Sequence, residues 1–226
     1  PGFICTWQNK QAEKGEVLSM GLLGRNGSQF AAAIVATGLN SSKVEFWTDV
    51  DGVYTADPRI VKDAILVDDM SYEEAMELSF FGSKVLHPKT LTPLASRNIE
   101  VWSLNSHNKE ARGTRIGKGP YPTVGPVRGI TCLKNTAMIS ISGSGMRGKT
   151  GIAARVFTAV SSAGISMLLI TQSSSEYTIS FCVSQSNANI CKEVLSEEFE
   201  LEIREDLINP IEVIENCAIV SIVGDG

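Results

Sequence analysis

The sequence lacks the features of membrane-spanning, secreted and nucleic-acid-binding proteins. No apolar run approaches the roughly 20 residues that a membrane helix needs, and the N-terminus lacks the charged-then-apolar order of a signal peptide. The five cysteines include no CxxC spacing, which favours reduced thiols and a cytoplasmic location, with no metal site. The 20 basic residues are scattered through a chain of net charge -5, which argues against a nucleic-acid groove.

The composition suits a soluble globular protein with one large domain or two small ones. Of its 226 residues 43% are hydrophobic, and the mean hydropathy is +0.05. The chain begins at Pro1 without an initiator methionine, and an apolar segment follows at residues 2–7. We therefore expect the sequence to start inside a longer protein.

Two segments of the chain repeat one another. Residues 218–226, AIVSIVGDG, nearly match residues 137–145, AMISISGSG, position by position. Self-similarity at a fixed offset is typical of repeated modules, and we expect a second module to begin at the end of this chain. The alternative is a chance agreement between two strand-turn segments.

The first half alternates predicted strands with predicted helices. Residues 17–23, 44–48 and 99–104 have the apolar pattern of short strands, which favours a mostly parallel α/β sheet. Residues 105–129 are rich in glycine, proline and charge, and this shift indicates a change of domain.

Local signals place the helices of this half. Ser28 is the expected N-cap of an alanine-rich helix, and Ser71 with Glu74 has the spacing of a capping box. Pro88 is expected to open the next helix. His87 is interpreted as a packing or capping residue, whereas His107 carries no functional signal.

The second half predicts an open βαββαβ unit. Strands are expected over 139–142, 166–171 and 177–183, with a hairpin through 172–176. One helix is expected to bury Ile152, Val156 and Val160, and a second to bury Ile190, Val194 and Leu195. Alternation with glutamates predicts an exposed last strand that contains Phe199, Leu201 and Ile203.

Three motifs in the first half indicate phosphoryl chemistry. The GRNGS turn at residues 24–28 can hold an anion on backbone N–H groups at a helix start. WTDVDGVYTADPR at residues 47–59 contains Arg59, and FFGSKVLHP at residues 80–88 contains Lys84. Both cations can neutralise phosphate oxygens.

Each motif also has a plain structural explanation. The glycine-rich turn suits an ordinary left-handed connection, and residues 49–52 suit a tight turn because the spacing is too short for an EF-hand. A solvated surface position is the default for Arg59, although Asp57 and Pro58 are expected to aim it inward.

In this order, and with ITQSSSE at residues 170–176, the motifs resemble those of the aspartokinases across essentially the whole chain. The resemblance implies the C-terminal part of a three-layer α/β amino-acid-kinase sheet over residues 1–122. An α+β ferredoxin-like ACT module is implied over 127–210, and the first strand of another over 211–226. SSSEYTISFC is most similar to the threonine-sensitive type, which is commonly fused to a homoserine dehydrogenase.

The family transfers the γ-phosphoryl of ATP, as its Mg²⁺ complex, to the side-chain carboxylate of L-aspartate. Two residues match its substrate-binding positions, Arg25 and Ser28. Five residues match its nucleotide-binding positions: Thr48, Asp49, Tyr54, Arg59 and Lys84. Five lie where its ACT modules hold an amino-acid effector: Met146, Gly151, Gln172, Ser174 and Glu176. Threonine is favoured over lysine, and the resemblance implies homo-oligomers through ACT modules.

The chain departs from the family at two points. Gln29 replaces a usual Asp, which removes a charge thought to order a lysine from the N-terminal half. The glycine-rich segment with the catalytic lysine does not occur in these 226 residues. We therefore expect the chain alone to lack kinase activity.

Two interpretations other than an aspartate kinase piece stay open. In the first, the chain is a non-catalytic module whose working part is the effector-binding ACT region. A carbamate or acetylglutamate kinase relative is a weaker alternative, because it would lack the repeated C-terminal modules.

Overall fold

The computed structural model describes residues 27–81, 86–121, 127–172 and 177–224. The chain divides into two units. Unit 1 comprises Pro1–Cys132 together with Val220–Gly226, and unit 2 comprises Leu133–Ile219.

Unit 1 contains a four-stranded mixed sheet in the order β1-β3-β4-β2. Its strands are β1 (Lys43–Thr48), β2 (Asp69–Ser71), β3 (Glu100–Asn105) and β4 (Thr114–Gly117). The pairs β1/β3 and β2/β4 are parallel and β3/β4 is antiparallel, so the predicted α/β class is confirmed. Strand β4 was not predicted from the sequence, and it lies inside the expected boundary region, residues 105–129. The strand predicted over 17–23 lies outside the described residues.

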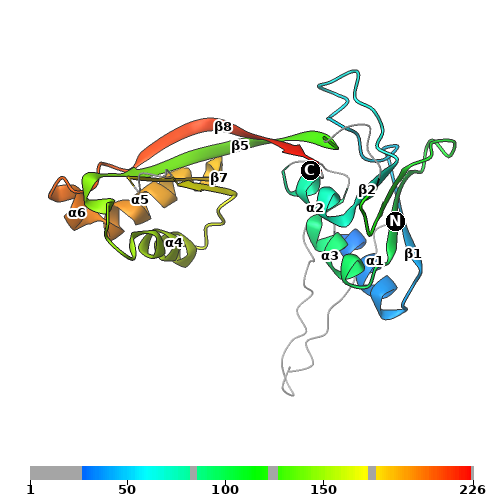
Figure 1. Cartoon of the computed structure of the whole chain (residues 1–226), viewed down its shortest axis with the longest axis horizontal. Helices are drawn as coiled ribbons and strands as arrows, with labels where there is room; N and C mark the ends of the chain where they lie inside the picture. Colours follow the sequence, from blue (N-terminus) through cyan, green and yellow to red (C-terminus); the bar gives the residue numbers. More distant parts are fainter. Residues whose placement is uncertain (1–26, 82–85, 122–126, 173–176, 225–226) are drawn as a thin grey trace, which may run out of the picture. The chain divides into compact units, whose positions relative to one another are not determined.

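Three helices gather on one side of this sheet (Figure 1), namely α1 (Gly27–Gly38), α2 (Tyr72–Phe80) and α3 (Pro88–Ser96). Capping signals fix two of their starts, as predicted. Ser71 and Glu74 form a complete capping box on α2, and the His87 side chain accepts a hydrogen bond from the Lys89 N–H at the start of α3. One expectation is wrong: α1 already includes Gly27, so Ser28 lies in its first turn instead of at the N-cap.

A buried ion pair connects α2 to the residues that follow the sheet of unit 1. Arg128 Nε lies 2.9 Å from Glu74 Oε1, and both side chains are less than a tenth exposed. The guanidinium also donates to the Tyr121 carbonyl, while the Arg128 N–H donates to the Val223 carbonyl. Glu74 Oε2 accepts from the Ser71 N–H, so both charges are surrounded by hydrogen-bond partners.

Unit 2 is built on a second sheet, in the order β6-β7-β5-β8, with its helices on one face (Figure 1). The strands are β5 (Gly129–Ser142), β6 (Leu169–Gln172), β7 (Thr178–Ser184) and β8 (Glu212–Val223). The helices are α4 (Ile152–Ser162), α5 (Ala188–Glu198) and α6 (Glu200–Arg204), with short 3₁₀ turns at η1 (Ser144–Met146) and η2 (Gln185–Asn187). Antiparallel pairing of β7 with β5 and β6 confirms the predicted α+β class.

The core of unit 2 follows most of the predicted pattern. Ile139, Ile141, Val156 and Val160 are fully buried, as expected from their spacing. The face of α5 was predicted only in part: Leu195 is fully buried as predicted, whereas Ile190 is half exposed. Ala188 and Cys191 complete the buried face.

The exposed last strand predicted through Phe199 is wrong, because these residues continue the helices. The Phe199 N–H donates to Leu195 O at 3.0 Å, and the Ile203 N–H donates to Phe199 O at 2.9 Å. The spacing of Phe199 and Ile203 corresponds to one helical turn as well as to an even strand interval. Arg155 favours the helix by pairing with Glu198 and Glu202.

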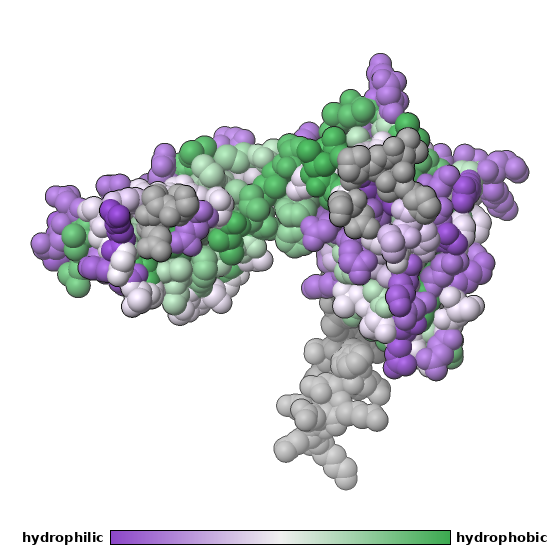
Figure 2. All heavy atoms as spheres, in the orientation of Figure 1, coloured by the Kyte–Doolittle hydropathy of each residue, from purple (hydrophilic) through white to green (hydrophobic). Residues whose placement is uncertain are grey.

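The repeated segments share a backbone feature. Asn135 in β5 and Asn216 in β8 stand at matching positions just before the two repeats, and both have left-handed backbone angles, with φ of 60° and 56°. Beyond each asparagine the strands differ in burial: Ile139 is fully buried, whereas the matching Val220 is 65% exposed. Figure 2 shows hydrophobic residues along the course of β8.

Candidate functional site

The candidate site of unit 1 lies where two parallel strands end. Thr48, the last residue of β1, pairs in register with Asn105, the last residue of β3. The N–H and hydroxyl of Ser106 both donate to the Thr48 carbonyl, at 2.8 and 2.9 Å. The loops that follow β1 and β3 therefore begin side by side, at the sheet edge where α/β proteins commonly bind ligands.

Asp51 connects these two loops. Its Oδ1 accepts hydrogen bonds from the side-chain amides of Asn105 at 2.7 Å and Asn108 at 3.2 Å. Its Oδ2 accepts from the Tyr54 hydroxyl at 3.3 Å. Burial and the Asp51 carboxylate raise the pKa of Tyr54, so the phenol stays neutral at physiological pH. Asp51 was not among the site residues predicted from the sequence.

The backbone after Asp51 is fixed by its fit against β4. Gly52 has φ of 146°, and an added Cβ there would lie 2.5 Å from the Thr114 hydroxyl. That hydroxyl accepts from the Val53 N–H at 2.8 Å and donates to the Val67 carbonyl at 2.7 Å. Residues 51–54 are thus held in one position.

Arg59 does not point inward as expected. Its side chain is 72% exposed and makes a bidentate pair with Asp57, with distances of 2.9 and 2.8 Å. Asp57 also accepts from the Arg59 N–H, so the two residues form a closed local turn. The hydrogen bonds from Arg59 to Asp57 raise the pKa of Arg59, which remains a cation.

The structure brings together only some of the predicted nucleotide and substrate residues. Thr48 lies half-buried with its hydroxyl near the Val50 N–H, and Asp49 is exposed in the same loop. Tyr54 is joined to this loop through Asp51. The predicted Arg25 and Lys84 lie outside the described residues, as do Ser174 and Glu176 of the predicted effector site.

The candidate site of unit 2 is a cavity of about 360 Å³ at the start of α4. Its lining includes three predicted effector residues, Met146, Gly151 and Gln172. Gly151 has φ of 92° and directly precedes α4, so N–H groups of the first helical turn border the cavity. Lys149 also lines it and was not predicted from the sequence.

A second cavity of about 540 Å³ lies on another side of α4. Its lining is mostly apolar and includes Phe157, Met167 and Ile170. Ile170 belongs to β6, an edge strand whose residues are all exposed.

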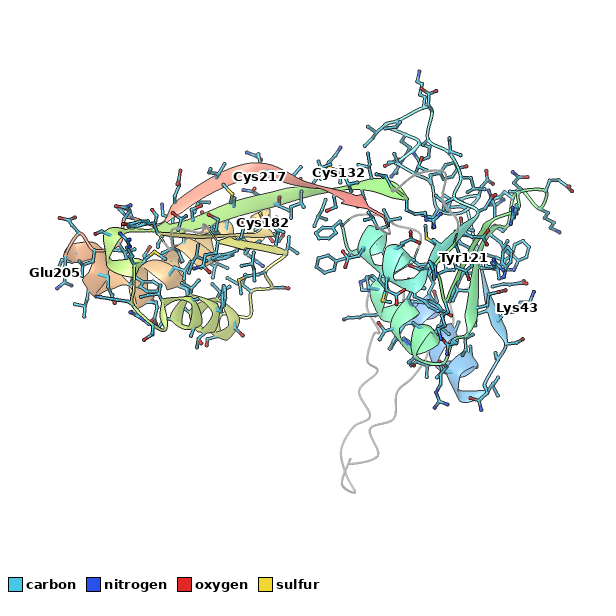
Figure 3. All side chains as sticks on the ribbon, in the orientation of Figure 1. Lys43, Tyr121, Cys132, Cys182, Glu205 and Cys217 are labelled. Carbon is cyan, nitrogen blue, oxygen red and sulfur yellow. The ribbon has the colours of Figure 1, made fainter. Side chains whose placement is uncertain are left out.

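The cysteines of unit 2 suit packing better than catalysis. Burial raises the pKa of Cys191 to about 11, and it also raises the pKa of Cys182. Cys182 in β7 and Cys217 in β8 belong to one sheet (Figure 3), and neither forms a disulfide. In the described parts of the chain, no cluster of His, Cys, Asp and Glu could hold a metal ion, and no helix could cross a membrane.

Comparison with known proteins gives matches over both units. Residues 2–105 match the amino acid kinase family, and residues 139–199 match the ACT domain. The bifunctional aspartokinase/homoserine dehydrogenase of Haemophilus influenzae is 53% identical over 214 residues, which is 95% of this chain and 26% of that protein. The chain thus spans about a quarter of the length of this relative.

Solved structures of an aspartokinase are also similar to this chain. E. coli aspartokinase III in complex with aspartate and ADP (R-state) is similar with a TM-score of 0.75 and 32% identity. The same enzyme in complex with lysine and aspartate (T-state) is similar with a TM-score of 0.71 and 32% identity. Each comparison covers 90% of this chain and 44% of the solved chain.

Proposed function

Because the chain is aspartokinase-like, with part of an amino acid kinase domain followed by an ACT domain, we propose that unit 1 serves the aspartate kinase reaction. In this reaction ATP phosphorylates the side-chain carboxylate of L-aspartate, at the start of the synthesis of lysine, threonine and methionine. The observation that carries the proposal is the similarity to an aspartokinase that holds aspartate and ADP. The polar loops that begin side by side at the ends of β1 and β3 support the proposal.

Each predicted residue has a role in this proposal. Thr48, Asp49 and Tyr54 contact the nucleotide, and Arg25 with Ser28 holds the aspartate. Lys84 and Arg59 neutralise phosphate oxygens of Mg-ATP, which the protein mainly needs to position. Arg59 would exchange its Asp57 partner for phosphate, and this exchange costs little because the pair is exposed.

We further propose that the cavity beside α4 binds an amino-acid effector. The N–H groups of the first turn of α4 suit a carboxylate, and Gln172 can hydrogen-bond the ligand's polar groups. A solved relative, E. coli aspartokinase III, is in complex with lysine, an amino acid of the class proposed for this cavity. Threonine is our favoured ligand for this chain.

A cytoplasmic location also stays a prediction.

A second candidate function is effector binding without catalysis. The 226 residues contain no glycine-rich segment with the family's lysine, and Gln29 stands where the family has Asp. In this alternative we propose that the polypeptide alone binds the amino-acid effector, and that it neither binds nor turns over ATP. A fused homoserine dehydrogenase is proposed only by similarity.

Calorimetric titration separates these functions. We expect saturable heats with Mg-ATP and with threonine, and a weaker or absent heat with lysine. Tyr54→Phe should weaken only Mg-ATP binding, and Gln172→Ala only threonine binding, which makes each variant the control for the other. Threonine heat without nucleotide heat would exclude the kinase role for this chain. Nucleotide heat alone would exclude the effector role.

We also propose a homo-oligomer formed through unit 2. The exposed edge of β6 can pair with another strand, and the apolar cavity beside Phe157 and Ile170 adjoins it. Light scattering on the wild type and on Ile170→Lys tests this assignment. A wild-type monomer, or a variant that associates as strongly as the wild type, would contradict it.

A further inference from the structure

We propose that Asp51 is a positioning residue for the nucleotide site, because it holds Tyr54 and locks together the loops that follow β1 and β3. The proposal rests on the proposed nucleotide role of Tyr54 and names a residue that motif matching does not assign. In the sequence, Asp51 belongs to an Asp-Val-Asp-Gly segment that also suits an ordinary tight turn.

The contacts of Asp51 are too many for a simple turn residue. Both carboxylate oxygens accept hydrogen bonds, and their donors come from two segments that are far apart in the sequence. Asn105 is buried, and its side-chain oxygen Oδ1 accepts from the His107 N–H at 2.8 Å. That contact leaves the Asn105 amide nitrogen directed at Asp51.

The position of the carboxylate is itself fixed from both sides. On its N-terminal side, the Thr48 carbonyl accepts two hydrogen bonds from Ser106, in the loop after β3. After it, Gly52 fits closely against β4 and the Val53 N–H is bound to Thr114. A carboxylate held between two anchored points can fix the direction of the Tyr54 hydroxyl.

The donors around Asp51 are neutral. Among the described residues, no basic side chain pairs with this carboxylate. Its charge therefore strengthens the hydrogen bonds from Tyr54, Asn105 and Asn108 instead of neutralising a cation. For binding of an anionic nucleotide, a nearby negative charge is unfavourable by itself. If Asp51 acted through charge alone, its removal would tighten nucleotide binding; if it positions Tyr54, removal weakens binding.

Titration calorimetry with Mg-ATP on the full chain tests the sign of this effect. Asp51→Asn keeps the side-chain shape but turns one acceptor oxygen into a donor, and we expect it to weaken binding about tenfold. Asp63→Asn is the matched control, since it removes the same charge from an exposed position on the same loop. It should leave binding unchanged or slightly tighter.

A double-mutant cycle shows whether Asp51 acts through Tyr54. In a Tyr54→Phe background, Asp51→Asn should change the affinity by less than about twofold, because the contact is already lost. Full weakening in that background, or wild-type affinity of Asp51→Asn, would overturn the proposal. If Asp51→Asn does not fold, Asn108→Ala removes one exposed donor, and it should weaken binding about two- to threefold.

A ligand-free measurement keeps this proposal separate from the proposed function. Titration of Tyr54, followed by NMR and assigned with Tyr54→Phe, should give a lower pKa in Asp51→Asn than in the wild type. If the wild type does not bind Mg-ATP, the nucleotide role fails, and this titration alone decides whether Asp51 holds Tyr54. An unchanged Tyr54 pKa would overturn the positioning role.

Discussion

The two repeated segments of the chain have similar sequences but opposite environments. After Asn135, β5 turns Ile139 and Ile141 into the core of unit 2, where both are fully buried. After Asn216, β8 leaves the matching Val220 and Ile222 exposed by 65% and 68%. An apolar strand pattern thus specifies a face that can be buried, while the elements packed on it decide whether it contributes to stability.

The largest effect of burial is expected at the ion pair between Glu74 and Arg128. Glu74→Ala leaves a buried guanidinium without its charged partner, and it should lower the free energy of unfolding of unit 1 by about 3–5 kcal/mol. Asp68→Ala is the control, because its pair with Arg112 is exposed and should contribute at most about 1 kcal/mol. Urea unfolding followed by tryptophan fluorescence reports on unit 1, which contains all three tryptophans. Equal losses of stability in Glu74→Ala and Asp68→Ala would contradict the prediction that the buried pair contributes more than the exposed one.

The repeat itself supplies the next test. Ile141→Ala should destabilise unit 2 by about 2–5 kcal/mol, since it opens a cavity in the core. Ile222→Ala makes the same chemical change at the matching exposed position and should alter stability by no more than about 0.5 kcal/mol. Methyl NMR signals of Val156 and Val160 across a urea titration measure unit 2 for Ile141→Ala, and tryptophan fluorescence across the same titration measures unit 1, to which Ile222 belongs. A large loss of stability in Ile222→Ala would mean that the face of β8 that contains Ile222 is covered in solution.

The two left-handed asparagines should behave alike, in contrast to the isoleucines. Asn135→Ala and Asn216→Ala should each cost about 1–2 kcal/mol, because a Cβ disfavours this backbone conformation without a local polar side chain. Asn135→Gly and Asn216→Gly avoid the steric cost and serve as the controls. Thermal unfolding of the four variants makes the comparison. A loss of stability at only one of the two positions would contradict the prediction that both asparagines have the same role in the repeated segments.

The smallest effect concerns the helices that cover Ile141. The hydrogen bond from Arg155 lowers the pKa of Glu202 below its ordinary value of 4.5. The stabilisation is therefore present above the unfolded-state pKa and is lost as the pH falls through the lower folded-state pKa. Both side chains are partly exposed, so the contribution should stay below about 1 kcal/mol. Glu202→Gln should reduce the loss of unit 2 stability between pH 6 and pH 3, which urea titrations would measure.

Local sequence signals predicted the parts of the fold that depend on neighbouring residues. The capping box at Ser71 and the start of α3 at Pro88 need only contacts within one helical turn, so they could be recognised. The segment through Phe199 was predicted wrongly because its apolar spacing fits both a strand and a helix. Arg155, which lies much earlier in the chain on α4, helps to decide between them.

In the candidate site, too, contacts between residues distant in the sequence could not be predicted. Thr48, Asp49 and Tyr54 could be named by resemblance, but the connection of Tyr54 to Asn105 through Asp51 depends on a contact between segments distant in the sequence. The pairing of Arg59 with Asp57 was missed for a different reason. Asp57 was expected to shape the loop, and its charge was not considered as the partner of Arg59.

The central claim is that this chain holds a nucleotide site in unit 1 and a separate amino-acid effector site in unit 2. Amide chemical shifts of the labelled chain, titrated with Mg-ATP and then with threonine, test it most directly. We predict saturable shifts for Mg-ATP at residues 48–59 and 105–108, and for threonine at residues 146–153 and at Gln172. Shifts from both ligands in one unit, or no saturable Mg-ATP shifts at residues 48–59, would contradict the account.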